Sequence, residues 1–147
     1  MRFLVFLLAM VSVPAWAQVT VENPWARATP PGAKIAAGYM TVRNAAAAPD
    51  HLVSASSPAA EKVETHVTAK DGDIFKMREV KGYDIPAQGS FELKPGGAHL
   101  MLVNIKAPFK EGERIPLVLK FARAGEVRTE LQVQAIGGSA PMQHMGH

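Results

Sequence analysis

Histidine and methionine side chains occur at positions where they could bind one metal ion together. His66 and Met77 lie in separate segments, and His99 and Met101 are two residues apart in a third. Thioether sulfur selects Cu(I) over hard cations, and imidazole also binds copper well. Structural zinc sites favour cysteine, which this chain lacks. Two histidines and two methionines would therefore fit Cu(I) better than zinc.

The spacing of these residues predicts how their side chains point. In a strand, residues two apart lie on the same face, roughly 6–7 Å apart, so His99 and Met101 could close on one ion. Gly96 and Gly97 precede them and would let the backbone bend and leave room for it. His66 alternates with apolar valines, which places it on the more polar face of its strand. A single methionine is more often a core residue than a ligand, so the grouping carries the hypothesis.

The segments that hold these residues are predicted to be short β-strands. Apolar or alternating runs recur along the chain, separated by glycine, proline and aspartate, which favour turns. Many short strands at even spacing predict an all-β domain, a β-sandwich or barrel. We expect strands at residues 19–22, 36–44, 52–56, 63–68, 74–78, 90–93, 100–105, 115–122 and 127–134. His51 falls in a predicted loop, whereas Trp25, Tyr39 and Met40 are expected to be packing residues.

The first 17 residues have the features of an export signal. Arg2 supplies a positive charge, residues 3–13 are apolar, and Ala15 and Ala17 form a small-x-small cleavage site. Cleavage after Ala17 would start the mature chain at Gln18. The apolar run is shorter than the roughly 20 residues that a membrane-spanning helix needs. We therefore expect a periplasmic protein that is not a transmembrane protein, without a cysteine to carry a lipid.

Charge and composition exclude several classes of function. The net charge is only +3, and lysine and arginine are scattered, so no basic stripe for nucleic acid is present in the sequence. Blue-copper electron transfer needs a cysteine thiolate, and the chain has none. The sequence contains no nucleophile elbow and no zinc-protease motif, so we expect no enzyme. A β-sandwich interaction module, with methionine and histidine as packing residues, remains an alternative.

The four candidate ligands also match a known signature. His66, Met77, His99 and Met101 fit the spacing H-x10-M-x21-H-x-M, and in this the sequence resembles the periplasmic copper chaperones called PCu(A)C. Segments 24–27, 38–44, 52–58 and 93–101 are similar to the family as well. The resemblance covers residues 19–133, nearly all of the expected mature chain.

The resemblance implies a cupredoxin-like Greek-key β-sandwich in a single domain. Cu(I) would lie at one exposed end, held by His66, Met77, His99 and Met101. The protein would be a carrier that delivers copper to a respiratory copper centre, the CuA site in subunit II of cytochrome c oxidase, often alongside a Sco-type protein. A periplasmic scavenger that confers copper resistance without transfer is the alternative function within this class.

The end of the chain forms a second group of candidate ligands. Residues 18–136 are expected to make up the β-sandwich domain, and residues 137–147 a flexible tail that begins with a glycine-rich linker. Short histidine-rich tracts often bind metal. Tails of this kind occur in part of the family, which implies a second copper ion, Cu(II), in this one. The candidate residues are Met142, His144, Met145 and His147.

Overall fold

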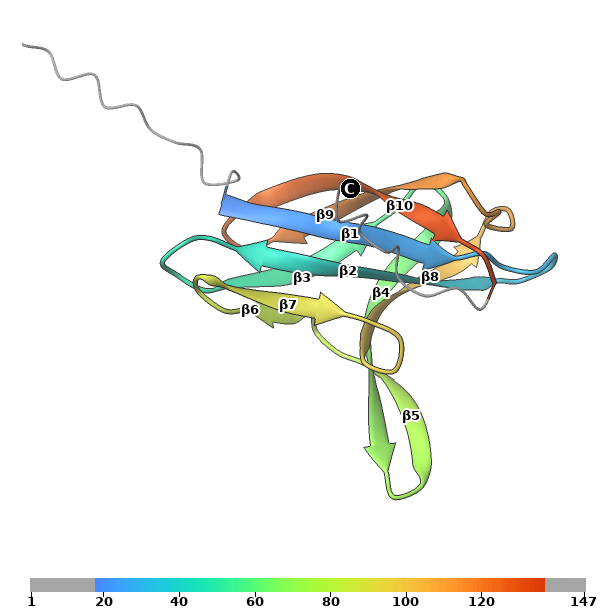
Figure 1. The fold of residues 1–147 in the computed structure, drawn as a ribbon, viewed down its shortest axis with the longest axis horizontal. Helices are drawn as coiled ribbons and strands as arrows, with labels where there is room; N and C mark the ends of the chain where they lie inside the picture. The colour runs from blue at the N-terminus through green and yellow to red at the C-terminus, as the bar shows by residue number, and fades with distance from the viewer. Residues whose placement is uncertain (1–17, 137–147) are drawn as a thin grey trace, which may run out of the picture.

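A computed structural model describes residues 18–136, and these residues form ten β-strands (Figure 1). No α-helix occurs in this described part, and none of its segments is a helix that could cross a membrane. The expected signal and the expected tail lie outside the described residues. The strands are β1 (Val19–Arg27), β2 (Ile35–Asn44), β3 (Asp50–Ser56), β4 (Ala60–Asp71), β5 (Ile74–Glu79), β6 (Tyr83–Ile85), β7 (Gly89–Leu93), β8 (Ala98–Ile105), β9 (Arg114–Phe121) and β10 (Gly125–Gln134).

The strands form one sheet that closes on itself. The order is β5-β4-β8-β2-β1-β10-β9-β3-β6, and an additional pairing between β3 and β4 joins the two arms of the sheet. Strand β5 extends the sheet beyond β4, and β7 pairs with β2 off the main path. The β1–β10 pair is parallel and the other pairs are antiparallel. The expectation of a single all-β domain, a sandwich or barrel, is therefore confirmed.

The nine expected strands all occur, and the differences come from short or polar segments. Strand β6 was not expected, because three residues between Gly82 and Pro86 give too little periodicity to recognise. Strand β4 runs on to Asp71, past the last apolar position, because β5 folds back and pairs with its polar end. His51 was expected in a loop, which is wrong. It lies in β3, pairs with Asp84 of β6 and is partly buried.

The core fills the inside of the closed sheet with alternate residues of each strand. In β8, Leu100 and Leu102 are fully buried, and in β9 Leu117, Leu119 and Phe121 are at most 2% exposed. Alternation in β8 therefore turns the intervening residues toward the outer face of the sheet. Burial of Trp25, Tyr39 and Met40 confirms that they are packing residues.

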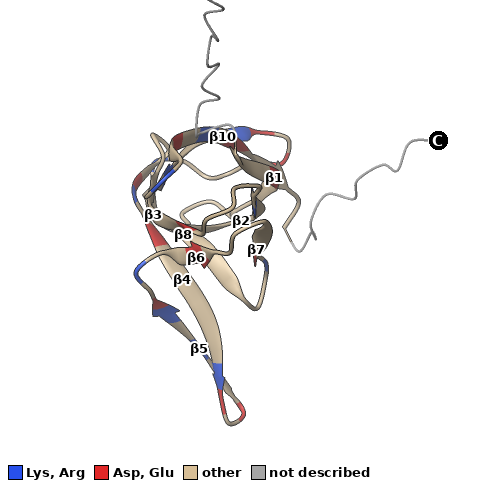
Figure 2. Cartoon of the chain, turned by 90° about the vertical axis from the view of Figure 1, so that its left-hand side faces the viewer, with Lys and Arg blue, Asp and Glu red and all other residues tan. Residues whose placement is uncertain are grey.

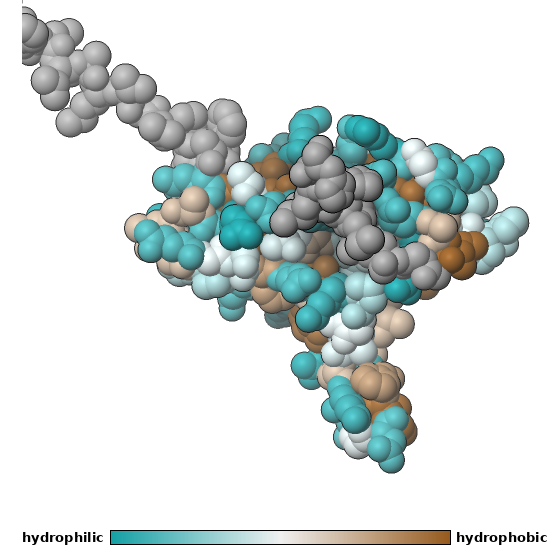
Figure 3. All heavy atoms as spheres, in the orientation of Figure 1, coloured by the Kyte–Doolittle hydropathy of each residue, from teal (hydrophilic) through white to brown (hydrophobic). Residues whose placement is uncertain are grey.

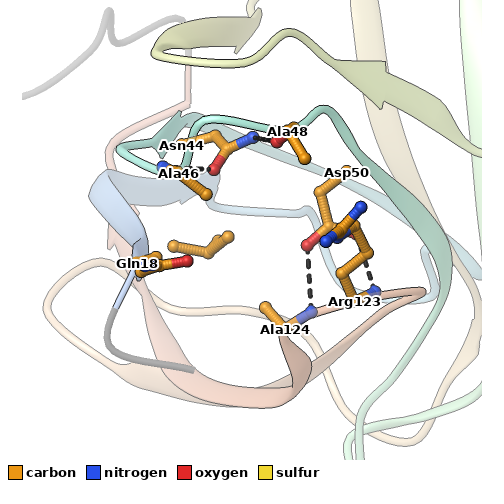
Figure 4. Close-up of a pocket in the computed structure, with 8 residues that line it drawn as sticks. Gln18, Asn44, Ala46, Ala48, Asp50, Arg123 and Ala124 are labelled. Atoms are coloured by element: carbon orange, nitrogen blue, oxygen red, sulfur yellow. Dashed lines mark hydrogen bonds between the residues drawn. The ribbon is translucent and has the colours of Figure 1, made fainter. Parts of the chain in front are cut away.

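Two buried polar side chains fix the connections at one end of the domain (Figure 4). The Asp50 carboxylate accepts hydrogen bonds from the backbone N–H groups of His51, Arg123 and Ala124, which anchors the turn between β9 and β10. Asn44 donates to the carbonyl oxygens of Ala48 and Pro86. These partners satisfy backbone groups that burial would otherwise leave unpaired.

Removing the Asp50 carboxylate should destabilise the domain because it leaves buried N–H donors unpaired. We expect Asp50→Ala to lower the free energy of unfolding by about 2–4 kcal/mol, measured by urea denaturation. Glu111→Ala removes the same charge from an exposed loop and should change it by less than about 0.5 kcal/mol. Equal effects of the two substitutions would contradict the anchoring role.

Candidate metal centre

Three neighbouring strands, β5, β4 and β8, bring the four predicted ligands onto one face of the sheet. In the β4–β8 ladder His66 lies directly opposite His99, and in the β4–β5 ladder Met77 lies opposite Thr68. Residues opposite each other in antiparallel strands share a face, as do residues two apart in one strand. Thr68 is two residues from His66, and Met101 is two residues from His99. All four side chains therefore emerge on the same side.

On that side the surface forms a hollow of about 300 Å³. Met77, His99 and Met101 line it, and the ring of His66 lies against the ring of His99 with 5.7 Å between centroids. The shared face predicted for His99 and Met101 is thus confirmed. The other lining residues are Arg27, Ile35, Ala36, Ala37, Tyr39, Thr68, Pro95 and Gly96.

The four side chains differ in their access to solvent. His99 is 5% exposed, and the side chain of His66 is 12% exposed. Met77 is 64% exposed and lies on the β4–β5 hairpin, which projects from the closed sheet (Figure 1). The site therefore joins two buried imidazoles to an accessible thioether on an edge strand.

Hydrogen bonds leave each histidine ring with one nitrogen free to bind a metal. The Glu64 carboxylate accepts from Nε2 of His66 at 2.8 Å, so in the neutral form of this ring Nε2 carries the proton and Nδ1 has the lone pair. That Nδ1 atom is buried and has no hydrogen-bond partner. In His99, Nδ1 donates to the Gly97 carbonyl oxygen at 3.2 Å, which leaves Nε2 unprotonated. A buried nitrogen without a partner is accounted for if a metal ion binds it.

Carboxylates surround His66 on its own face of the sheet. Hydrogen bonds, first from His66 and then from Lys62, lower the pKa of Glu64 and keep it anionic. Glu64, His66 and Glu79 each place a ligand atom within 4.8 Å of the others. A carboxylate that accepts from a metal-binding imidazole fixes the ring and makes it a better donor. Glu64 was not predicted to be a site residue, although its position two residues before His66 in a predicted strand indicates a shared face.

Burial determines the protonation state of the other groups beside the site. Loss of hydration, with a smaller effect of the nearby His66, lowers the pKa of His99, so its ring stays neutral. Tyr83 is also buried, and its hydroxyl donates to the carbonyl oxygens of His66 and His99 at 2.6 and 2.8 Å. Burial raises the pKa of Tyr83 to about 12, so the hydroxyl keeps its proton. Tyr83 was not predicted to be a site residue because it lies in β6, a strand that was not expected.

The fold and the site together define an all-β domain that gathers histidine and methionine side chains on one outer face. This chain belongs to the LpqE-like family, described as "Putative lipoprotein LpqE-like", whose model matches residues 19–133. The "Putative lipoprotein Lxx21020" of Leifsonia xyli is 31% identical over 138 residues, which cover 88% of this chain and 82% of that protein. Protein RP573 of Rickettsia prowazekii is 31% identical over 114 residues, covering 74% and 62%.

Solved structures with the same fold are PCu(A)C domains. The copper-bound PCuAC domain from PmoF2 is 30% identical, with a TM-score of 0.70 over 80% of this chain and 93% of that domain. The Cu(I) form of DR1885 from Deinococcus radiodurans is 31% identical, with a TM-score of 0.61, covering 82% and 83%. The resemblance to the PCu(A)C family is thereby confirmed.

The lowered pKa of His99 should make stability depend on pH in one direction. The unfolded chain takes up a proton near pH 6.5 and the folded chain only at lower pH, so the stability contribution is full above pH 6.5 and is lost as pH falls through the folded pKa. We expect His99→Gln to reduce this slope by up to about 1.4 kcal/mol per pH unit in urea denaturation between pH 5 and 8. His51→Gln serves as the control and should keep the contribution of His99 to the pH dependence of the free energy of unfolding. An unchanged slope in His99→Gln would refute the assignment.

Proposed function

We propose that this protein is a periplasmic copper chaperone that binds Cu(I) through His66, Met77, His99 and Met101 and passes it to another protein. The observation that carries the proposal is the gathering of these four side chains on one face of three adjacent strands, where Met77, His99 and Met101 line a hollow and the ring of His66 lies against that of His99. The copper-bound state of two related domains supports the choice of metal. Copper is thus the cargo of a carrier, and no reaction is catalysed.

The donor set suits Cu(I) for electrostatic as well as chemical reasons. Two thioethers and two neutral imidazoles add no charge, so the ion keeps its single positive charge in a partly buried place. The anionic Glu64 beside His66 partly compensates that charge. Soft, neutral donors bind Cu(I) better than they bind hard divalent ions.

Release would begin at the accessible side of the site. Met77 is the exposed member of the set, so an acceptor's thiolates could replace its sulfur first and the buried histidines last. This stepwise exchange keeps copper coordinated throughout the transfer. The acceptor that the family resemblance implies is the CuA site in subunit II of cytochrome c oxidase, with a Sco-type protein as a further partner. Export by a signal cleaved after Ala17 would place the carrier in the same compartment.

The first test is an anaerobic Cu(I) competition titration of residues 18–147. We expect stoichiometric, tight uptake that is lost when His66, Met77, His99 and Met101 are all replaced by alanine. His99→Ala and Met101→Ala should each weaken binding by about tenfold or more, as expected when a group of a metal site is removed. Met40→Leu removes a methionine that is 2% exposed in the core and should bind as the wild type does.

The outcomes of this titration separate the competing functions. A protein without stoichiometric uptake would be an interaction module, which would overturn the proposal. Uptake that persists in the quadruple variant would show that the metal binds to another part of the chain. Given uptake, incubation of the loaded protein with an apo-CuA domain distinguishes delivery from storage. Retention of copper by the carrier would favour the scavenger function.

We further propose that Met142, His144, Met145 and His147 bind a second ion, Cu(II). The chemistry of these side chains supports the proposal, because short histidine-rich tracts often bind metal. Gln134, at the end of β10, pairs with Arg27, which lines the hollow beside His99 and Met101. The eleven residues 137–147 could span up to about 36 Å when extended, so they could reach the face that carries the Cu(I) site.

Removal of residues 141–147 should abolish the second site and leave the first intact. We expect the truncated protein to lose one equivalent of Cu(II), seen by electron paramagnetic resonance, and to keep its Cu(I) stoichiometry. As a matched control, a chain of full length with Met142, His144, Met145 and His147 replaced by serine should behave like the truncated one. Undiminished Cu(II) binding in both proteins would contradict a metal role for the tail.

A further inference from the structure

Tyr83 connects the backbones of both candidate histidine ligands through one hydroxyl group. The hydroxyl donates to two carbonyl oxygens, that of His66 at an oxygen–oxygen distance of 2.6 Å and that of His99 at 2.8 Å. The phenol ring belongs to the hydrophobic core and is 4% exposed. The hydroxyl therefore approaches β4 and β8 from the core side, while the two imidazoles emerge on the outer face.

We propose that Tyr83 is a positioning residue that holds His66 and His99 at the separation and orientation that Cu(I) requires. The inference rests on the proposed function and extends it to a residue outside the ligand set. A side chain carried by a strand moves with its backbone, so a bridge between the two carbonyl groups restrains both rings together. The distance that it restrains is the 5.7 Å between the ring centroids.

This restraint acts where the ladder between β4 and β8 is close to its end. The last pair is Val67 with Ala98, so the pair formed by His66 and His99 is the penultimate one. Beyond it the chain turns at Gly96, whose φ is +82°. Terminal pairs of a ladder open more readily than central ones. A hydroxyl that binds both strands at this point keeps the two histidines from moving apart.

The tyrosine can restrain the histidines because it is itself held on several sides. Its ring stacks on Phe91 with centroids 4.8 Å apart. The Thr65 hydroxyl donates to the Val80 carbonyl oxygen and accepts from the Gly82 N–H, which ties the preceding loop to β4. Gly82 has a φ of +74°, and a Cβ atom there would lie 1.9 Å from the Leu52 carbonyl oxygen, so this close approach requires glycine. The phenol thus projects from a fixed base.

Tyr83→Phe removes the hydroxyl and keeps the ring, so it tests the bridge directly. We expect Cu(I) affinity in the competition titration to fall about 10- to 100-fold, the range observed when a partner of a metal ligand is lost. X-ray absorption at the copper edge should also show a smaller imidazole contribution than in the wild-type protein. A purely structural role would lower the melting temperature and leave this spectrum unchanged.

A core variant in β9, a strand that carries none of the candidate ligands, provides the matched control. Leu117→Val in β9 shortens a side chain that is 1% exposed, and its affinity and copper spectrum should equal those of the wild type. Unaltered affinity and spectrum in Tyr83→Phe would overturn the inference while leaving the proposed function standing. An equal loss in Leu117→Val would overturn it too, since general destabilisation would then explain the effect. Absence of Cu(I) uptake by the wild-type protein would instead refute the proposed function and, with it, the inference.

A second variant covers the case in which Tyr83→Phe does not fold. Thr65→Val leaves the phenol in place but releases the loop that carries it, and Thr65 does not face the metal side. Weaker Cu(I) binding in folded Thr65→Val would support the positioning role. Wild-type affinity in that variant, together with an unfolded Tyr83→Phe, would show that Tyr83 serves the fold alone.

Discussion

The register between β4 and β8 is the constraint on which the candidate site depends. It sets His66 opposite His99, and a slip of one residue would turn either ring toward the core. Apolar residues fix the register because Leu100 and Leu102 are fully buried inside the closed sheet. The hydrophobic effect thus specifies the face on which His99 and Met101 emerge. The site is a consequence of core packing and of which strands are neighbours.

If His66 and His99 bind copper as proposed, the same packing prepares both rings to act as donors. Burial disfavours the charged imidazole of His99, and the anionic Glu64 takes the proton-bearing nitrogen of His66. Each ring therefore presents one lone pair without any rearrangement of hydrogen bonds. Organising the donors in advance in this way reduces the conformational freedom that metal binding would otherwise remove. This arrangement leaves the buried Nδ1 atom of His66 without a hydrogen-bond partner, which costs stability. Buried polar atoms are normally hydrogen-bonded, and exceptions occur at functional sites.

Local sequence pattern predicted the faces of the strands but not their neighbours. Alternation around His66 and in the segment of His99 and Met101 was sufficient to place these side chains away from the core. The ladder that unites the two segments, by contrast, depends on pairing between residues more than thirty positions apart. Strand β6, which contains Tyr83, was not predicted for the same reason. Its three residues form a strand only because they pair with β3. The relation of Glu64 to His66 was local, and it was overlooked because a carboxylate is not a soft ligand.

If Met77 is a copper ligand as proposed, the exposure of the β4–β5 hairpin follows from the different demands of holding and releasing an ion. Ile74, Phe75 and Met77 are more than 60% exposed. Brown and tan apolar surface is visible beside hydrophilic surface on the projecting hairpin (Figure 3). An exposed apolar edge strand is ordinarily an aggregation hazard, and charges on β5 counter it, as Figure 2 shows. Lys76 and Arg78 alternate with the apolar residues along this strand.

A carrier cannot bury all of its ligands, because an acceptor must reach at least one of them before the ion leaves. Two buried histidines without an exposed donor would hold copper well and exchange it slowly. Four exposed donors would exchange copper quickly, but the closed sheet would no longer hold them in fixed positions. Placing Met77 on an edge strand, next to a ladder that keeps His66 and His99 in place, meets both demands. On the proposed function, the hairpin projects because the ligand that begins the transfer has to be accessible.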